Sequence, residues 1–134
     1  MKSLFDTTES IRYDCTIFES MKKRAMQLLS KTENGEYTQA IVLYSKSGAE
    51  YSAIIKNACT VDMVSEKDLI EELKLCNDTA IRYLLCMWAD NCIDIPSFAF
   101  RKILCEINPE NSEACLFVTA MDGVRAIKLS KTMK

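Results

Sequence analysis

Two segments decide the fold of this chain: Val64-Ser65-Glu66-Lys67-Asp68-Leu69-Ile70 and Ile95-Pro96-Ser97-Phe98-Ala99-Phe100-Arg101. In the first, Ser65 is followed three positions later by Asp68, a spacing that favours a helix start. In the second, Pro96 begins a helix, because its fixed φ suits the first helical turn. Residues 81–89 between them are nearly all apolar, which is typical of a strand covered on both faces. The region therefore predicts a helix, a strand and a second helix.

The flanking sequence adds one helix and four strands. Apolar residues at helical spacing from about Thr16 predict a first helix, and Thr16 with Glu19 resembles a capping box. Residues 37–44 and 50–55 predict a β-hairpin, and residues 115–120 and 124–129 predict two more strands around a turn at 121–123. Residues 1–13 show no period and are expected to be an irregular extension.

The predicted order is α, β, β, α, β, α, β, β. Strands that alternate with helices favour a three-layer α/β/α domain, here with a mixed sheet of five strands. A length of 134 residues fits one domain spanning 1–134 and is enough to bury a core.

Composition excludes several classes of function. A net charge of −2 and the lack of a basic stripe with interleaved aromatic residues argue against nucleic-acid binding. The sequence shows neither a leader pattern nor an apolar run of about 18 residues, so we expect no membrane segment and a cytoplasmic location.

The chain has no histidine and seven cysteines. Catalysis by Ser-His or Cys-His pairs and imidazole ligation of metals are therefore excluded. No two cysteines form a Cys-x-x-Cys pair, so we expect buried free thiols rather than disulfides or a zinc cluster.

The two opening segments resemble the two signatures of the small cytidine deaminase family, which includes blasticidin deaminases. These signatures are Cys-Ala-Glu-Arg at the start of one helix and Pro-Cys-Gly-x-Cys-Arg at the start of the next. The predicted order of helices and strands is also that of the family, and the resemblance extends from the first helix to the last strand. It implies the cytidine deaminase-like fold.

In that family the signatures supply three zinc ligands and a glutamate that shuttles protons as zinc-bound hydroxide attacks cytosine. The ligand positions correspond here to Val64, Ser97 and Phe100. Valine and phenylalanine have no donor atom and a neutral serine hydroxyl is a poor ligand, so we expect no zinc and no other cofactor. Phe98 replaces a glycine of the signature, so we expect aromatic side chains to fill the former site.

Four further positions follow from the resemblance. Glu66 corresponds to the proton shuttle and Arg101 to the arginine after the second cysteine. Without zinc, we favour a solvent-facing Glu66 in a first helical turn over a retained catalytic role. In the nucleoside pocket Asn57 matches the family's asparagine and Tyr37 lies near an aromatic position that stacks on the base. Substrate-binding candidates are therefore Tyr37, Asn57, Glu66, Ser97 and Arg101.

Three functional hypotheses follow. The first is a pseudoenzyme without zinc, an oligomeric binding or structural subunit. Because small cytidine deaminases are homotetramers, the resemblance implies a homo-oligomer (dimer or tetramer) or a hetero-oligomer with an active relative. The alternative is a sensor module that binds a nucleoside or nucleotide in the remodelled cleft. The third is a divergent hydrolase of deaminase type, either with other chemistry on Glu66, Ser97 and Arg101 or with zinc relocated to cysteines such as Cys59 and Cys76.

Overall fold

The computed structural model describes residues 10–31, 38–56 and 64–133 of the chain. The element order matches the prediction, with three short additions. The helices are α1 (Cys15–Lys31), α2 (Val64–Leu75) and α3 (Phe98–Ile107), and the strands are β1 (Gln39–Ser45), β2 (Glu50–Ile55), β3 (Ile81–Trp88), β4 (Ile93–Asp94), β5 (Cys115–Ala120) and β6 (Gly123–Lys128). The additions are β4 and two 3₁₀ turns, η1 (Pro109–Glu113) and η2 (Leu129–Thr132).

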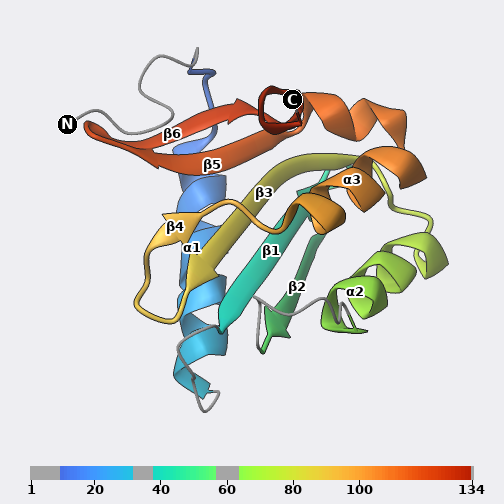
Figure 1. Ribbon diagram of the computed structural model, residues 1–134, viewed down its shortest axis with the longest axis horizontal. Coiled ribbons are helices and arrows are strands. Elements are labelled where there is room, and N and C mark those ends of the chain that lie inside the picture. Colours follow the sequence, from blue (N-terminus) through green and yellow to red (C-terminus); the bar gives the residue numbers. More distant parts are fainter. Residues whose placement is uncertain (1–9, 32–37, 57–63, 134) are drawn as a thin grey trace.

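The strands form one mixed sheet in the order β2-β1-β3-β5-β6, with β4 paired to β3 outside this path. β3 and β5 are parallel, and the other pairs are antiparallel. Figure 1 shows α1 behind the sheet and α2 and α3 in front of it. The predicted three-layer α/β/α fold is therefore confirmed, with a sheet of six strands instead of five because two residues of the β3–α3 connection also pair.

The sheet separates two hydrophobic cores. On one face Phe18, Met21, Ala25 and Leu29 of α1 pack on the sheet beside Phe117. On the other face α2 and α3 bury a larger set that includes Leu69, Leu73, Phe100 and Leu104. The apolar run of β3 serves both cores, since Leu84 and Cys86 belong to one, and Tyr83, Leu85 and Met87 belong to the other. A strand covered on both faces is what this run predicted.

The start of α1 differs from the predicted capping box. Asp14 Oδ1 accepts hydrogen bonds from the backbone N–H groups of Thr16 and Ile17, at 2.9 and 3.1 Å. The cap is therefore Asp14, and Glu19 is exposed. Aspartate is at least as good a cap as threonine because its charge also complements the helix dipole.

Residues 10–13 form no helix or strand, yet they are packed. The backbone N–H of Ile11 donates to Ala126 of β6 at 2.8 Å, and the ring of Tyr13 packs against Phe18 and Phe117. This part of the predicted extension covers the free edge of β6.

The molecule has two contrasting ends along the strands. At the helix-start end, α2 and α3 begin and β3 ends. At the turn end lie the β1–β2 turn, residues 77–81 and η1, joined by a bond from Lys46 N to Ala80 O at 2.9 Å. Ligands of α/β proteins bind at the carboxyl ends of parallel strands, which here is the helix-start end.

Candidate functional site

Glu66 and Ser97 meet at the helix-start end, although 31 positions separate them in the chain. The Ser97 hydroxyl donates to Glu66 Oε2 at 3.1 Å, and Ser97 Oγ accepts a bond from the backbone N–H of Phe100 at 3.2 Å. Ser97 is thus the N-cap of α3 and a partner of the carboxylate. The Ser97 hydroxyl therefore acts both as a donor and as an acceptor within the protein.

Glu66 is buried, with 6% of its surface exposed. The sequence favoured a solvent-facing acid, and the structure corrects this. The reason is that Ser97 brings a hydroxyl donor against the first turn of α2, and a carboxylate with a hydrogen-bond donor can be buried at lower cost. The structure therefore brings together Glu66 and Ser97, two of the predicted site residues.

The residues at the three expected ligand positions do not fit zinc. Val64 is 58% exposed at the start of α2, whereas Phe100 is fully buried in the core under α3. Ser97 is the one oxygen donor of the three, and its hydroxyl already bonds to Glu66 and Phe100 N. Zinc in proteins needs three or four nitrogen, sulfur or carboxylate ligands, so this set cannot hold it.

Cys86 of β3 also lies close to Glu66. Burial, with smaller contributions from the carboxylates of Asp94 and Glu66, raises the pKa of the Cys86 thiol far above its ordinary value. A thiol kept protonated in this way is an apolar core residue rather than a metal ligand.

The aromatic residues of the second segment take different places. The Phe100 ring fills the core, as expected of a former site occupied by aromatic side chains. Phe98 is instead 53% exposed, and the guanidinium carbon of Arg101 lies 5.5 Å from its ring centroid. Only one of the two phenylalanines therefore fills the interior.

Arg101 anchors backbone rather than facing a ligand. Its Nε donates to Pro96 O at 3.0 Å and its Nη1 donates to Thr132 O at 2.7 Å, so it ties the start of α3 to η2. The residue is 7% exposed, and burial lowers the pKa of its guanidinium. The backbone at Thr132 is consequently held against α3.

Tyr37 and Asn57, the other two predicted binding residues, lie outside the residues that the structure describes, as does Cys59. Sequence reasoning missed the acceptor role of Thr132, because a backbone carbonyl near the chain end gives no sequence signal.

The described cysteines are free thiols, as predicted, but among them Cys86 alone is fully buried, while Cys105 and Cys115 are half-buried. Cys15, Cys76 and Cys92 are exposed, because they lie at a helix start, after a helix end and in a loop. Over the described ranges, no three Cys, Asp or Glu side chains lie together in a way that could hold a metal ion. No helix in these ranges is long and apolar enough to cross a membrane.

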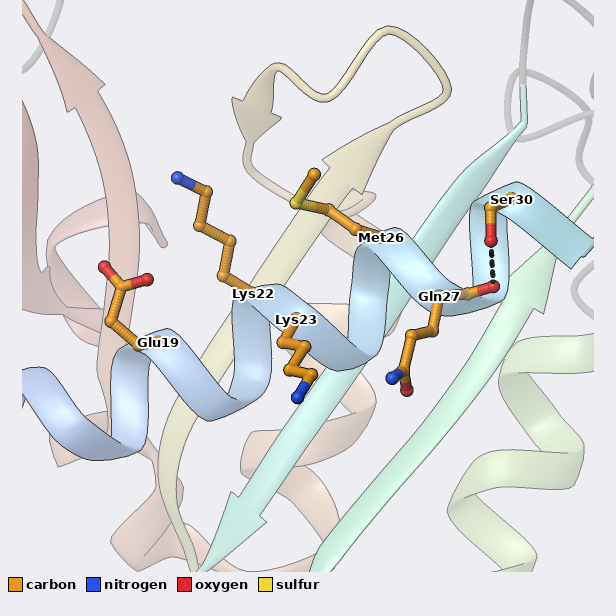
Figure 2. Close-up of a pocket in the computed structure, with 6 residues that line it drawn as sticks. All are labelled: Glu19, Lys22, Lys23, Met26, Gln27 and Ser30. Carbon is orange, nitrogen blue, oxygen red and sulfur yellow. Dashed lines mark hydrogen bonds between the residues drawn. The ribbon is translucent and has the colours of Figure 1, made fainter.

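A hollow on the outer side of α1 does not enclose a second site of this kind. Figure 2 shows this hollow, lined by Glu19, Lys22, Lys23, Met26, Gln27 and Ser30. All six residues come from one helix, so no second element encloses a ligand, and α1 lies across the sheet from Glu66.

Comparison with known proteins places the fold. No family model matches the chain, and no curated protein matches its sequence. Solved structures do match. The cytidine deaminase of Mycobacterium leprae superposes with a TM-score of 0.63 at 15% identity, over 87% of this chain and 96% of that one. The cytidine deaminases of Mycobacterium tuberculosis and Burkholderia pseudomallei give TM-scores of 0.61 and 0.60 at 13% and 10% identity, over 86% and 84% of this chain and 92% and 93% of theirs.

Such low identity carries the fold and not the activity. The likeness covers nearly the full length of each solved chain, so no layer of the fold is missing here. The structure confirms what the two opening segments implied about architecture: this chain has the cytidine deaminase-like fold.

Proposed function

We propose that this protein is a cytidine deaminase-like protein without deaminase chemistry, which acts as a binding or structural subunit in the cytoplasm. The proposal rests on the residues at the three expected zinc-ligand positions of the helix-start end. Two of the three expected ligand positions have no donor atom, and the third, Ser97, bonds to Glu66 and Phe100 N. Deamination of cytosine by this fold needs a metal hydroxide, and these side chains cannot hold the metal.

A subunit of this kind acts through its surfaces. The resemblance to homotetrameric enzymes supports assembly, as a homo-oligomer or together with an active relative. Val64 and Phe98 are large apolar side chains left exposed at the two helix starts. Apolar side chains at such a place suit a contact with another chain.

Elemental analysis of protein purified without added metal or chelator tests the proposal. We expect less than about a tenth of an equivalent of zinc per chain. A gain-of-ligand variant, Val64→Cys with Ser97→Cys, Phe98→Gly and Phe100→Cys, rebuilds the donor set around Glu66 and should bind about one equivalent. The matched control replaces the three ligand positions with alanine and should stay metal-free.

One equivalent of zinc in the unmodified protein would overturn the proposal, and deaminase assays would follow. Light scattering coupled to size exclusion then measures assembly. A protein that stays monomeric at micromolar concentration and captures no cytidine deaminase of the same cell would also contradict the role as a subunit.

A second candidate function is a sensor that binds a nucleoside or nucleotide. The exposed ring of Phe98 lies beside the buried Glu66–Ser97 pair, and such a ring can stack on a base. This hypothesis predicts a rise in melting temperature with some member of a nucleoside and nucleotide panel, lost in Phe98→Ala. Silence across the panel would reject it.

A hydrolase built on Glu66, Ser97 and Arg101 has less support. The Ser97 hydroxyl has a carboxylate partner, but Ser97 Oγ also caps α3. Arg101 donates to the backbone at Pro96 O and Thr132 O. Unchanged behaviour of Glu66→Gln in every assay would remove this hypothesis.

A further inference from the structure

The free edge of β2 is a second feature of the surface, away from the Glu66–Ser97 pair. β2 is the first strand of the sheet and pairs only with β1. The bond from Ser45 N to Ala49 O at 2.9 Å marks Ser45 and Ala49 as a hydrogen-bonded pair, and such pairs alternate with non-hydrogen-bonded pairs along the hairpin. By this register Tyr51, Ala53 and Ile55 exchange backbone bonds with β1, so the backbone groups of Glu50, Ser52 and Ile54 point outward.

Within the described residues, no backbone group donates to or accepts from the outward N–H and C=O groups of Glu50, Ser52 and Ile54. At the opposite edge of the sheet, β6 accepts the bond from Ile11 N. Strand edges with unpaired N–H and C=O groups are templates for a further strand, and proteins usually protect them. β2 carries neither proline nor lysine, the usual protecting residues.

A groove of about 370 Å³ runs between this edge and α2. Its walls are residues 52–54 of β2 and one side of α2, with Ala53, Ile54 and Leu69 as the apolar part. Its other lining residues, Ser65, Asp68 and Glu72 of α2 and Ser52 of β2, are polar. An edge strand with outward backbone groups and a groove beside it for side chains are the two elements of recognition by strand addition.

The charge of the groove selects the partner. Among the described residues that line it, the ionisable ones are Asp68 and Glu72, both exposed, and none is a lysine or arginine. Arg24 of α1 reaches the β2 edge through a bond from its Nε to Ser52 Oγ at 3.4 Å. Neither carboxylate forms an ion pair with another described residue. They lie four residues apart on α2, a rise of about 6 Å, and alternate residues of a strand are about 6.7 Å apart. Cationic side chains at alternate positions of an added strand therefore match both carboxylates.

We propose that the β2 edge and α2 form a docking groove for an extended basic segment of a partner protein, with Lys or Arg at alternate positions, added as a further strand of the sheet. A second copy of this chain fits less well, because a two-fold pairing of β2 with β2 brings two sets of Asp68, Glu72 and Glu50 together. Binding in this groove does not depend on the loss of zinc chemistry. An absence of peptide binding would therefore leave the proposed function unchanged, and zinc in the purified protein would leave the docking proposal unchanged.

The test uses a fluorescent eight-residue peptide of alternating Lys and Val and measures anisotropy against the full chain at two salt concentrations. We expect saturable binding that weakens with salt and falls at least about tenfold for Asp68→Asn with Glu72→Gln. The matched control, Glu19→Gln with Glu106→Gln, removes two exposed carboxylates elsewhere and should bind as the parent does. A peptide of the same composition with its lysines in one block should bind at least about tenfold more weakly.

Amide hydrogen exchange distinguishes strand addition from attraction between charges alone. With the alternating peptide, exchange should slow at Ser52 and Ile54, the outward amides, and stay unchanged at Tyr51 and Ala53, which already bond to β1. Equal binding of the blocked peptide, equal loss in the control variant, or no protection at Ser52 and Ile54 would each overturn the proposal. So would dimerisation of the chain with the same protection in the absence of peptide.

Discussion

The two ends of the sheet differ in how far their polar side chains are buried. At the helix-start end Ser97 and Glu66 hold the start of α3, and at the turn end Asn111 holds its last turn. At the turn end Asn111 is fully buried, and the three hydrogen bonds of its side chain are all internal. At the helix-start end Ser97 and Phe98 are exposed while Glu66 is buried beneath them. The turn end is thus a closed scaffold, and the helix-start end presents side chains to solvent.

Replacing Asn111 should have the largest effect on this comparison. Its Oδ1 accepts from Ile81 N, and its Nδ2 donates to Thr79 O and Leu104 O, each at 2.8 Å. Asn111→Ala removes the partner of Ile81 N and of Thr79 O, and leaves Leu104 O with the bond from Asn108 N at 3.3 Å as its remaining partner. We expect the free energy of unfolding to fall by about 3 kcal/mol. Urea unfolding followed by circular dichroism measures this.

Asn108→Ala is the control for Asn111. Asn108 caps η1 through Glu110 N, is half-buried, and should lose only about 1 kcal/mol. Equal losses for the two variants would mean that the turn end is not the closed scaffold described above.

Arg101→Met should have the next largest effect, and it acts where the start of α3 meets η2. Methionine retains the apolar stem but leaves Pro96 O and Thr132 O without their charged donor. We expect a loss of about 2 kcal/mol and faster proteolysis near η2, because Arg101 ties η2 to α3. Lys102→Met, an exposed neighbour on the same helix, should change stability by less than about 0.5 kcal/mol.

Ser97→Ala should cost less, about 1 kcal/mol, the usual value for a lost N-cap. A sharper variant is Ser97→Asp, because aspartate is normally as good a cap as serine. Here it places a second carboxylate against Glu66, so we expect no recovery at neutral pH and recovery in acid, where one carboxyl is protonated. Parent-like stability of Ser97→Asp at neutral pH would show that Ser97 and Glu66 do not share the site as described.

The sequence predicted the scaffold better than the site. The period of α1, the hairpin and the apolar run of β3 follow from local patterns, which hold wherever one face of an element is buried. β4 was not predicted because a strand of two residues shows no period. The burial of Asn111 was not predicted because an asparagine within Pro-Glu-Asn-Ser-Glu is typical of a surface loop. Its burial follows from tertiary bonds to Thr79 and Ile81, about 30 positions away.

At the site, the resemblance identified the right residues and the wrong environment for one of them. Glu66 stands among charged residues, a local pattern of an exposed helix face, and only its meeting with Ser97 explains its burial. The exposure of Cys76 and Cys92 was missed for the related reason that residue type alone does not fix where a loop runs.

The pH dependence of stability gives the smallest expected effect, and it concerns the turn end. Burial alone would raise the pKa of Asp78, but the hydrogen bonds donated by Tyr51 and Ser47, each at 2.8 Å, outweigh it, and the pKa lies below its ordinary value of 3.8. A lowered pKa means that the folded state binds the proton less readily than the unfolded state. The stability from Asp78 is therefore present above about pH 4 and lost as the pH falls through the folded pKa.

Tyr51 sets the alkaline limit of the same contact. Its bond to Asp78, the main cause, with burial second, raises the pKa of the Tyr51 phenol above its ordinary value of 10.0, so this contribution weakens as the pH rises beyond that value. Urea midpoints of the parent, Asp78→Asn and Tyr51→Phe over the acid range test the assignment. Both variants should flatten the acid limb, because each removes one half of the bond that lowers the Asp78 pKa. If both keep the parent's slope below about pH 4, the acid sensitivity of the fold arises from carboxylates elsewhere, and the turn end is closed by Asn111 without help from Asp78.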